Sequence, residues 1–309
     1  MTALRIATRQ SKLALWQAEH VAALLRAAHP GLQVDLVKIV TQGDRILDRP
    51  LADIGGKGLF IKELEVALAE QRADIAVHSM KDVPSDLPAG MTLAAMLPRA
   101  DARDAFIATR FASIEALPKA ARIGTSSLRR QCQLRQMRND IEIIPLRGNV
   151  DTRLRKLDAG EFDAIILASA GLIRLGLSDR ITQLLPIDQS VPAVGQGIIG
   201  IECRADDVRS LEIVCALDNA PAQVCIAAER AFASRLEGSC QSPIGGHAEL
   251  VGAQLKLQGM IASVDGAQIF RDSIVGAQKD APALGRALAE RMLFAGADKL
   301  LKELRGAGH

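Results

Sequence analysis

The chain has 309 residues, of which 49% are hydrophobic and 24% are charged, and its formal net charge is +2 at pH 7. This length exceeds one ordinary hydrophobic core and predicts a globular protein of two or three domains. The near-neutral charge gives no reason to expect a nucleic-acid or membrane partner, and no apolar run reaches transmembrane length.

The cysteines and aromatic residues narrow the choice further. Five cysteines are present, and no two have the CxxC spacing, so we expect neither a disulfide framework nor a metal site. The first residues lack the apolar core of a secretion signal, which predicts a cytoplasmic protein with reduced thiols. Tyrosine is absent and Trp16 is the only tryptophan, so aromatic stacking is excluded as the main binding mode.

The first unit of the chain is a buried strand at residues 4–8, followed by a helix with apolar residues at helical spacing. Arg9 and Ser11 lie between them, where ligands bind in α/β sheets, and we expect them to meet an anion at the helix N-terminus. The alternative is a Ser11 helix cap beside a solvated Arg9.

A second strand is predicted at residues 32–40, and the long connection after it suggests a mobile lid. The Gly-rich sequence at 55–58 lacks the Walker spacing, so it is weak support for a nucleotide site. A helix over residues 59–71 follows.

Lys81 and Asp82 follow a short strand predicted at residues 74–77. They form either a charged turn before Pro84 or a general acid/base carboxylate beside a cation. Further strands are predicted at 91–97 and 105–109, and the polar sequence between them marks a crossover into a second domain.

The second domain is rich in arginine. A strand at 122–124, the hydroxyl-rich turn Thr125-Ser126-Ser127 and a helix at 128–138 would present free N–H groups to an anion. Strands at 141–146 and 163–168 follow. Residues 122–156 contain eight Arg, one Lys and three acidic residues. Codon bias explains many arginines but not their position after strand ends, so we expect a cleft that binds carboxylates.

The chain then returns to the first domain through residues 191–203, a Gly-rich strand in which Gln196 could reach the cleft. This double crossover is typical of two-lobed binding proteins, and a helix at 206–217 follows it. A smaller α+β domain begins near Pro221, with strands at 250–261 and 268–275, a turn at 265–266 and a closing helix at 284–304. Within it, Cys240 lies on a Gly-flanked loop past a helix, either as a small buried residue or as a reactive thiol.

Together these segments resemble the porphobilinogen deaminase family over essentially the whole chain. The resemblance is carried by RIATRQSKLALWQ at 5–17, GGKGLFIKELE at 55–65, HSMKDVPSDLP at 78–88, GTSSLRRQ at 124–131, LRGNVDTRLRKLD at 146–158, PAVGQGIIGIECR at 192–204 and LEGSCQSPIG at 236–245. Ser242 departs from the family pattern, which usually has a β-branched residue at that position.

The resemblance implies the fold, the reaction and the site. We expect two periplasmic-binding-protein-like α/β domains with a double crossover, at 1–98 with 198–216 and at 103–192, plus an α+β domain at 220–309. The implied enzyme condenses four porphobilinogens into hydroxymethylbilane on a dipyrromethane cofactor, which Cys240 carries through a thioether. Asp82 is the implied catalytic residue. Nothing in the sequence demands an obligate assembly, so we expect a monomer.

The resemblance also assigns side chains to the two ligands. The residues implied to hold the cofactor are Cys240, Lys81, Asp82, Thr125, Ser127, Arg129, Arg130 and Arg153. Those implied to surround the substrate or growing chain are Arg9, Ser11, Phe60, Arg147, Arg153, Arg174 and Gln196. Two rivals remain from the residues alone: a two-lobed carboxylate-binding protein without catalysis, and a cysteine-nucleophile transferase. The latter needs a base near Cys240, and the nearby His247 is expected at the surface.

Overall fold

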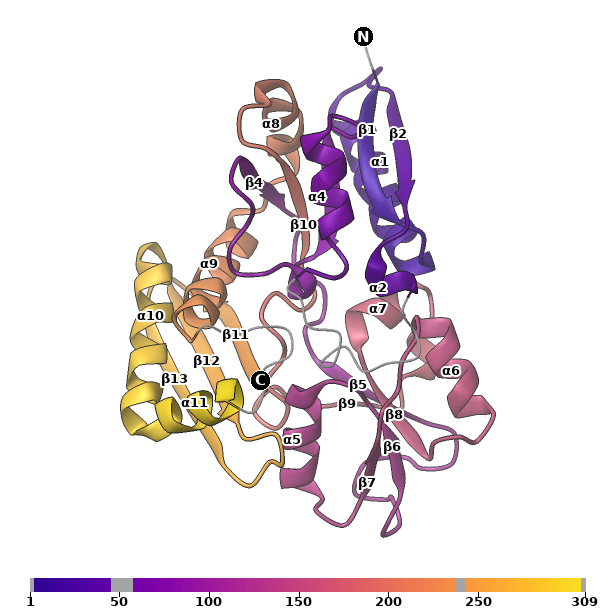
Figure 1. Cartoon of the computed structure of the whole chain (residues 1–309), viewed down its shortest axis with the longest axis vertical. Helices are drawn as coiled ribbons and strands as arrows, with labels where there is room; N and C mark the ends of the chain where they lie inside the picture. Colours follow the sequence, from indigo (N-terminus) through magenta and orange to yellow (C-terminus); the bar gives the residue numbers. More distant parts are fainter. Residues whose placement is uncertain (1–2, 46–57, 237–242, 307–309) are drawn as a thin grey trace.

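The computed structural model describes residues 3–45, 58–236 and 243–306. Within these ranges the chain forms three sheets, each with its own helices, and Figure 1 shows them as three masses around a common centre. Two sheets have five strands and lie at opposite ends of the longest axis, and the third has three strands and lies to one side. This arrangement confirms the predicted fold class.

The first sheet combines parallel and antiparallel pairs. Its strands, in spatial order, are β2 (Val34–Ile39), β1 (Leu4–Arg9), β3 (Ile75–Ser79), β10 (Ile199–Arg204) and β4 (Met91–Met96). β1 is parallel to β2 and β3, whereas β10 is antiparallel to β3 and β4.

Helices cover both faces of this sheet because side chains alternate along each strand. Leu4 and Ile6 pack against α1 (Lys12–Ala28), while Ala7 faces α4 (Lys62–Ala69). Helix α4 is shorter than the helix predicted over 59–71, because the backbone at Ile61 is not helical. Helix α8 (Val208–Val214) completes the α1 side.

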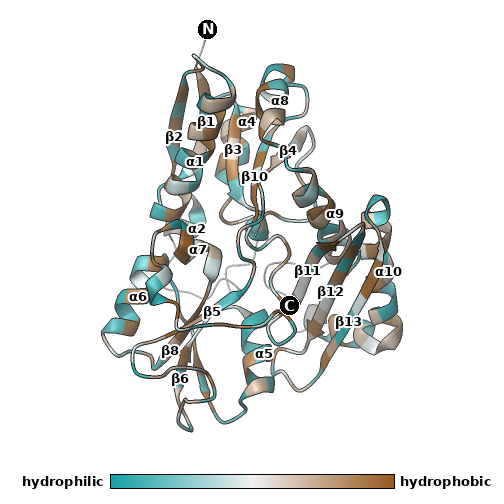
Figure 2. Ribbon diagram, turned by 180° about the vertical axis from the view of Figure 1, so that it is seen from behind, coloured by the Kyte–Doolittle hydropathy of each residue, from teal (hydrophilic) through white to brown (hydrophobic). Residues whose placement is uncertain are grey.

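The second sheet repeats this plan. Its strands, in spatial order, are β7 (Glu142–Ile144), β6 (Arg122–Gly124), β8 (Ala164–Ala168), β5 (Asp104–Ala108) and β9 (Gln183–Leu184). Its helices are α5 (Leu128–Met137), α6 (Val150–Asp158) and α7 (Ser169–Arg174). Figure 2 shows hydrophobic colour on strands such as β10 and hydrophilic colour on much of α6, as expected for strands covered by amphipathic helices.

The chain crosses between these two sheets twice. It leaves the first sheet after β4 to form β5, and it returns from the second sheet to form β10. In each sheet, the strand that enters from the other lobe pairs antiparallel with the third strand of the local set, β8 or β3. The predicted double crossover is therefore present.

The third unit contains α9 (Ala220–Arg235), the antiparallel strands β11 (Ile244–Val251), β12 (Gln254–Ala262) and β13 (Ile269–Ala277), and the helices α10 (Ala281–Met292) and α11 (Asp298–Gly306). Two predictions here were wrong. The single strand expected at 250–261 is two strands joined by a turn at Gly252, whose φ is 58°. The closing helix breaks at Gly296, which has a φ of 112°. Apolar spacing does not reveal either break.

Among the described residues, no single helix is long and apolar enough to cross a membrane. One bent pair, Val208–Leu217 with Ala220–Arg235, passes the same length and composition test when its two parts are taken together.

Candidate active site

A short turn after β3 presents Lys81 and Asp82. The 3₁₀ turn Met80–Asp82 is anchored by Met80, which is 1% exposed and packs with Ile198. The Met80 amide donates to the Ile198 carbonyl over 3.0 Å. Because Met80 is fixed on both its backbone and its side chain, the two charged residues that follow it leave the sheet in a defined direction.

The Gly-rich return segment makes room for this turn. A Cβ on Gly195 would lie 2.7 Å from the Met80 Cβ, and one on Gly197 would lie 2.6 Å from the Ala100 carbonyl oxygen. Both glycines also have positive φ, 72° and 89°. Side chains are therefore excluded at these positions both by space and by backbone conformation. The predicted strand over 191–203 begins only at Ile199 for this reason.

Lys81 meets the cations of the second sheet. Burial lowers its pKa to about 8, and the negative charge of Asp82 opposes that shift. The ammonium group also interacts electrostatically with Arg130, Asp104 and Arg153, all from the other lobe. The structure thus brings together charged residues that lie far apart in the sequence, as the strand-end argument predicts.

The hydroxyl-rich turn follows β6 as expected. Thr125 is 2% exposed, and its Oγ1 accepts a hydrogen bond from the Ser127 amide over 3.3 Å. Ser126 donates to the Leu146 carbonyl at 2.9 Å. Ser127 precedes α5, and its side chain makes no capping hydrogen bond within the described part of the chain. Its hydroxyl is therefore not committed to the helix.

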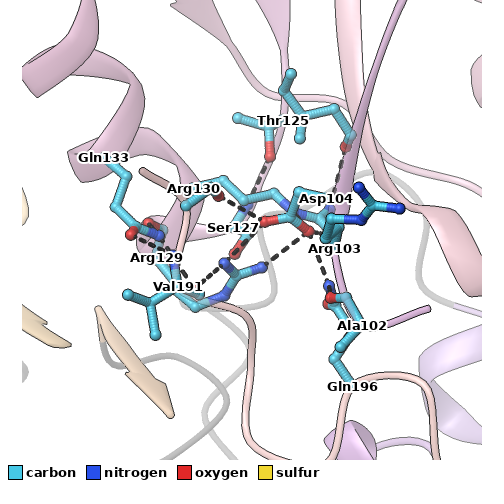
Figure 3. A network of polar contacts seen from close by, with 12 residues as sticks. Ala102, Arg103, Asp104, Thr125, Ser127, Arg129, Arg130, Gln133, Val191 and Gln196 are labelled. Carbon is cyan, nitrogen blue, oxygen red and sulfur yellow. Dashed lines mark hydrogen bonds and ion pairs between the residues drawn. The ribbon is translucent and has the colours of Figure 1, made fainter. Parts of the chain in front are cut away.

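Arg129 and Arg130 share one carboxylate, that of Asp104 (Figure 3). Arg129 Nη1 lies 2.8 Å from Asp104 Oδ2, and Arg130 Nη2 lies 2.8 Å from Asp104 Oδ1. The two guanidinium groups hold the pKa of Asp104 well below its usual range, although burial acts in the opposite direction. Sequence reasoning missed Asp104, which it assigned to a crossover segment.

Gln196 belongs to the same network. It is 1% exposed, and its Nε2 donates to the Ala102 carbonyl at 2.6 Å and to Asp104 Oδ1 at 3.0 Å. Figure 3 shows it on the opposite side of Asp104 from Thr125. In this structure Gln196 therefore joins the two crossover segments.

Three further arginines from the predicted set are positioned by carbonyl groups or by burial. Arg153 Nε donates to Gly148 over 2.7 Å, and Arg174 Nη2 donates to Gly197 over 2.7 Å. Burial lowers the pKa of each to about 10. Arg147 Nη1 is buried and has no hydrogen-bond partner in the structure as described. Folding has already removed much of the water around these guanidinium groups, so an anionic ligand that binds them does not have to displace it.

Arg9 and Ser11 differ in their surroundings. The Arg9 guanidinium carbon lies 4.2 Å from the centre of the Phe60 ring, a cation–π contact between two residues of the predicted substrate set. Ser11 is the N-cap of α1, and its hydroxyl accepts from the Ala14 amide at 3.3 Å. The capping alternative therefore describes Ser11 in this structure.

Two sequence predictions fall outside the described residues. Cys240 and the unusual Ser242 lie in 237–242, and most of the expected lid lies in 46–57. Helix α9, which leads to Cys240, ends at Arg235 as the Gly238 stop signal suggests.

His247 corrects another expectation. It was expected at the surface, but it lies in β11 and is 5% exposed. Its Nδ1 is 3.3 Å from Arg99 Nη1, and burial, assisted by the positive charge of Arg99, lowers its pKa to about 3. The strand that buries it begins at Ile244, earlier than the sequence pattern indicated. A group with so low a pKa is a poor general base, which removes the support for the cysteine-nucleophile alternative.

Comparison with known families decides among the remaining alternatives. Residues 4–212 match the family model described as "Porphobilinogen deaminase, dipyromethane cofactor binding domain", and residues 223–294 match "Porphobilinogen deaminase, C-terminal domain". The chain belongs to the porphobilinogen deaminase family. It is a hydroxymethylbilane synthase of tetrapyrrole biosynthesis with a dipyrromethane cofactor, and porphobilinogen is the substrate.

Solved structures of other proteins have a similar arrangement at low sequence identity. They include the VFT2 domain of BvgS from Bordetella pertussis (12% identity, 70% of this chain and 86% of that chain, TM-score 0.43). Another is YhfZ from Shigella flexneri (17% identity, 77% and 99%, TM-score 0.38). A third is a methionine-binding lipoprotein from Bacillus subtilis (12% identity, 70% and 90%, TM-score 0.44).

The described residues fit the cofactor of this family. A dipyrromethane carries acetate and propionate groups, and the unpartnered buried Arg147 Nη1 is a donor that such a carboxylate would satisfy. Lys81, Arg130 and Arg153 supply further positive charge at the same place. Several cations are therefore gathered where the carboxylates of such a cofactor would need them.

Proposed function

We propose that Asp82 is the general acid/base of the condensation and that Cys240 anchors the cofactor. The observation that carries the proposal is the electrostatic contact of the Lys81–Asp82 turn with Arg130 and Arg153 across the two lobes. Asp104 is saturated by its own donors, so Asp82 is the carboxylate suited to proton transfer while the neighbouring cations bind the substrate's carboxylates.

The residues divide into two groups by role. Hydrogen bonds to charged groups contribute roughly 1.5–3 kcal/mol each, so several guanidinium groups can hold a chain that gains two carboxylates with each added unit. The side chains proposed to hold the cofactor are Lys81, Asp82, Thr125, Ser127, Arg129, Arg130 and Arg153. Those proposed to hold the substrate and growing chain are Arg9, Ser11, Phe60, Arg147, Arg153, Arg174 and Gln196.

The chemical roles follow from the bonds that must change. Each cycle releases the substrate's amino group as ammonia and joins the resulting carbon to a pyrrole α-carbon, which then loses a proton. Asp82 protonates the departing amine, and its carboxylate then stabilises the cationic azafulvene before assisting removal of the α-carbon proton. When bound, the dipyrromethane supplies the first pyrrole α-carbon as a nucleophile. Cys240 holds it through a thioether that survives turnover.

We propose the domain limits expected from the sequence: 1–98 with 198–216, then 103–192, and then 220–309. The three separate sheets support these limits.

We propose a monomer, because the exposed large apolar side chains of the described residues are distributed over several elements, among them Val66, Ile173, Val208 and Phe294. We propose a cytoplasmic location, which the four free cysteines of the described ranges support. Light scattering with size-exclusion chromatography tests whether the protein is a monomer.

The test of the central proposal uses Asp82→Asn, which keeps size and shape but removes the proton-transfer group. We expect this variant to contain the covalent cofactor by intact mass and to lose at least about 10²-fold in turnover. Asp86→Asn, a nearby carboxylate outside the proposed site, is the matched control and should retain activity. Near-normal turnover in Asp82→Asn refutes the assignment.

A second measurement tests the anchor. Denatured protein should exceed its polypeptide mass by two linked pyrrole units, with the excess on the peptide that contains Cys240. Cys240→Ala should fold and carry no such mass, whereas Cys215→Ala should carry it in full. Covalent cofactor in the Cys240→Ala variant refutes the anchoring role.

A further inference from the structure

Asp104 is the centre of the buried network in Figure 3. The side chain is fully buried and accepts six hydrogen bonds. Four come from Arg129 and Arg130, one from Ser190 Oγ at 2.9 Å and one from Gln196 Nε2 at 3.0 Å. A carboxylate has about four acceptor positions, so Asp104 is saturated by protein donors.

These donors come from separate parts of the chain. Asp104 is the first residue of β5, directly after the first crossover, and the two arginines open helix α5. Ser190 and Gln196 lie in the second crossover, which Arg129 also contacts through the Val191 carbonyl at 2.6 Å. One carboxylate thus connects both crossover segments to the helix that carries the cations.

The hydrogen bonds also fix the orientation of Arg130. Its Nε and Nη2 both donate to Asp104 Oδ1, at 3.0 and 2.8 Å, and its Nη1 donates to the Ile166 carbonyl at 3.1 Å. A guanidinium has five N–H donors, so one N–H on each terminal nitrogen has no acceptor among the described residues. This guanidinium lies close enough to Lys81 and Arg153 for their charges to interact.

We propose that Asp104 is a positioning residue for cofactor loading, because its hydrogen bonds fix the orientation of Arg130 and leave two N–H groups of that guanidinium for a ligand. The inference rests on the proposed role of Arg130 toward the cofactor and extends it to a residue that does not itself contact the ligand. A prearranged guanidinium loses less conformational entropy when a carboxylate binds, and Asp104 supplies this arrangement before the ligand arrives.

A simpler role would be charge balance alone, in which Asp104 only neutralises two buried arginines. The two roles differ when one arginine is removed. If Asp104 only balances charge, the Asp104→Asn substitution should do less harm in the Arg129→Gln variant than in the wild type. The variant has already lost one of the two cations that Asp104 neutralises. If Asp104 positions Arg130, its loss should slow loading in that background as well.

The experiment measures loading of full-length apo-protein made in cells that lack porphobilinogen. The protein is incubated with porphobilinogen, and intact mass follows the gain of two pyrrole units with time. The variants are Asp104→Asn, Arg129→Gln, their combination and Arg130→Gln. The control is Asp101→Asn, which disrupts a neighbouring carboxylate–guanidinium pair with Arg103 that does not contact α5. Urea unfolding midpoints are measured for each variant before loading.

We expect the combined variant to load at least about 10-fold more slowly than Arg129→Gln alone, while Asp101→Asn loads at the wild-type rate. Equal rates in the combined variant and in Arg129→Gln overturn the positioning role and leave charge balance. Arg130→Gln tests the underlying assignment separately: if it loads normally, Arg130 does not bind the cofactor, and the proposed site rather than the role of Asp104 has failed. The unfolding midpoints show whether a slow rate reflects loss of folded protein. Loading rates are compared per amount of folded protein.

Discussion

Arg99 Nη2 lies 2.6 Å from Glu229 Oε1, and this ion pair joins the first crossover segment to helix α9 of the third domain. The carboxylate of Glu229 also accepts from the backbone amides of Gly195 and Ala248, each at 2.7 Å. Its partners therefore come from both crossovers and from strand β11. One buried carboxylate of the third domain, the domain that contains Cys240, thus bonds to both crossovers at the junction of the other two.

Loss of Arg99 should destabilise the whole protein. Glu229 is 0% exposed, so Arg99→Ala leaves a buried carboxylate without its cation, and burial already raises its pKa. Breaking a buried pair on one side typically costs about 3–5 kcal/mol. Urea unfolding at pH 7 measures the change in free energy.

The matched control is Arg235→Ala, also an arginine paired with a glutamate. Arg235 and Glu290 are 43% and 57% exposed, and pairs of this kind contribute about 0–1 kcal/mol. Similar losses in the two variants would show that the Arg99 pair is not the stabilising contact described above.

His247 should make the protein sensitive to mild acid. Its folded pKa is about 3, well below the ordinary histidine value of 6.5, because the ring is buried beside Arg99. The unfolded chain therefore binds a proton that the folded chain does not, between these two values. The stability due to neutral His247 is complete above pH 6.5 and falls as pH drops toward 3, by about 2 kcal/mol at pH 5.

Unfolding free energies at pH 7.5 and pH 5 test this for wild type and His247→Gln. The substitution should reduce the difference between the two pH values by about 2 kcal/mol. An unchanged difference would mean that other groups cause the acid sensitivity.

The charged side chains that follow strand ends were the most predictable part of the site. The rule that ligands bind beyond the carboxyl ends of strands in α/β sheets pointed to the region of Lys81, Asp82, Thr125 and Arg130, while their individual roles came only from the family resemblance. The rule depends only on local strand and helix patterns. Strands covered by helices on both faces are continuous apolar runs, so their ends can be recognised in the sequence.

Asp104 and Glu229 could not be found in the same way. Each lies in a segment whose local pattern is ordinary, a polar crossover and an amphipathic helix, and each acquires its role from residues 19 to 130 positions away. Pairing over such separations depends on how the sheets meet. His247 was missed for a related reason, since the start of β11 at Ile244 follows directly on the Pro243 of a segment taken as loop.

The Arg9–Phe60 contact should contribute to substrate binding. Phe60→Leu keeps an apolar side chain but removes the ring over which Arg9 lies at 4.2 Å. Losing a cation–π contact of about 1 kcal/mol corresponds to a roughly fivefold increase in KM for porphobilinogen, with little change in kcat. Steady-state kinetics of the cofactor-loaded enzyme measures both.

The chain contains its own control for this substitution. Arg110 lies over Phe111 at 5.3 Å in the second lobe, and neither residue is in the proposed site. Phe111→Leu should leave KM unchanged. Equal effects of the two substitutions would indicate a general loss of structure in place of a specific contact.

Lys81 should limit cofactor loading at alkaline pH. Its pKa is lowered to about 8, mainly by burial, so in the apo-protein it loses its positive charge as pH rises through 8. Only the charged ammonium form can make a charge-assisted hydrogen bond to an incoming carboxylate. Arginine stays charged over this range, so Lys81→Arg should be less affected.

The informative quantity is the ratio of loading rates, Lys81→Arg over wild type, measured by intact mass between pH 6.5 and 9.5. The Cys240 thiol also becomes more reactive as pH rises, and taking the ratio removes that effect because both proteins contain the same thiol. We expect the ratio to increase at least about threefold across pH 8, since the wild-type protein alone loses its cation there. A constant ratio would show that Lys81 is still charged at pH 9.5 or does not bind the incoming carboxylates.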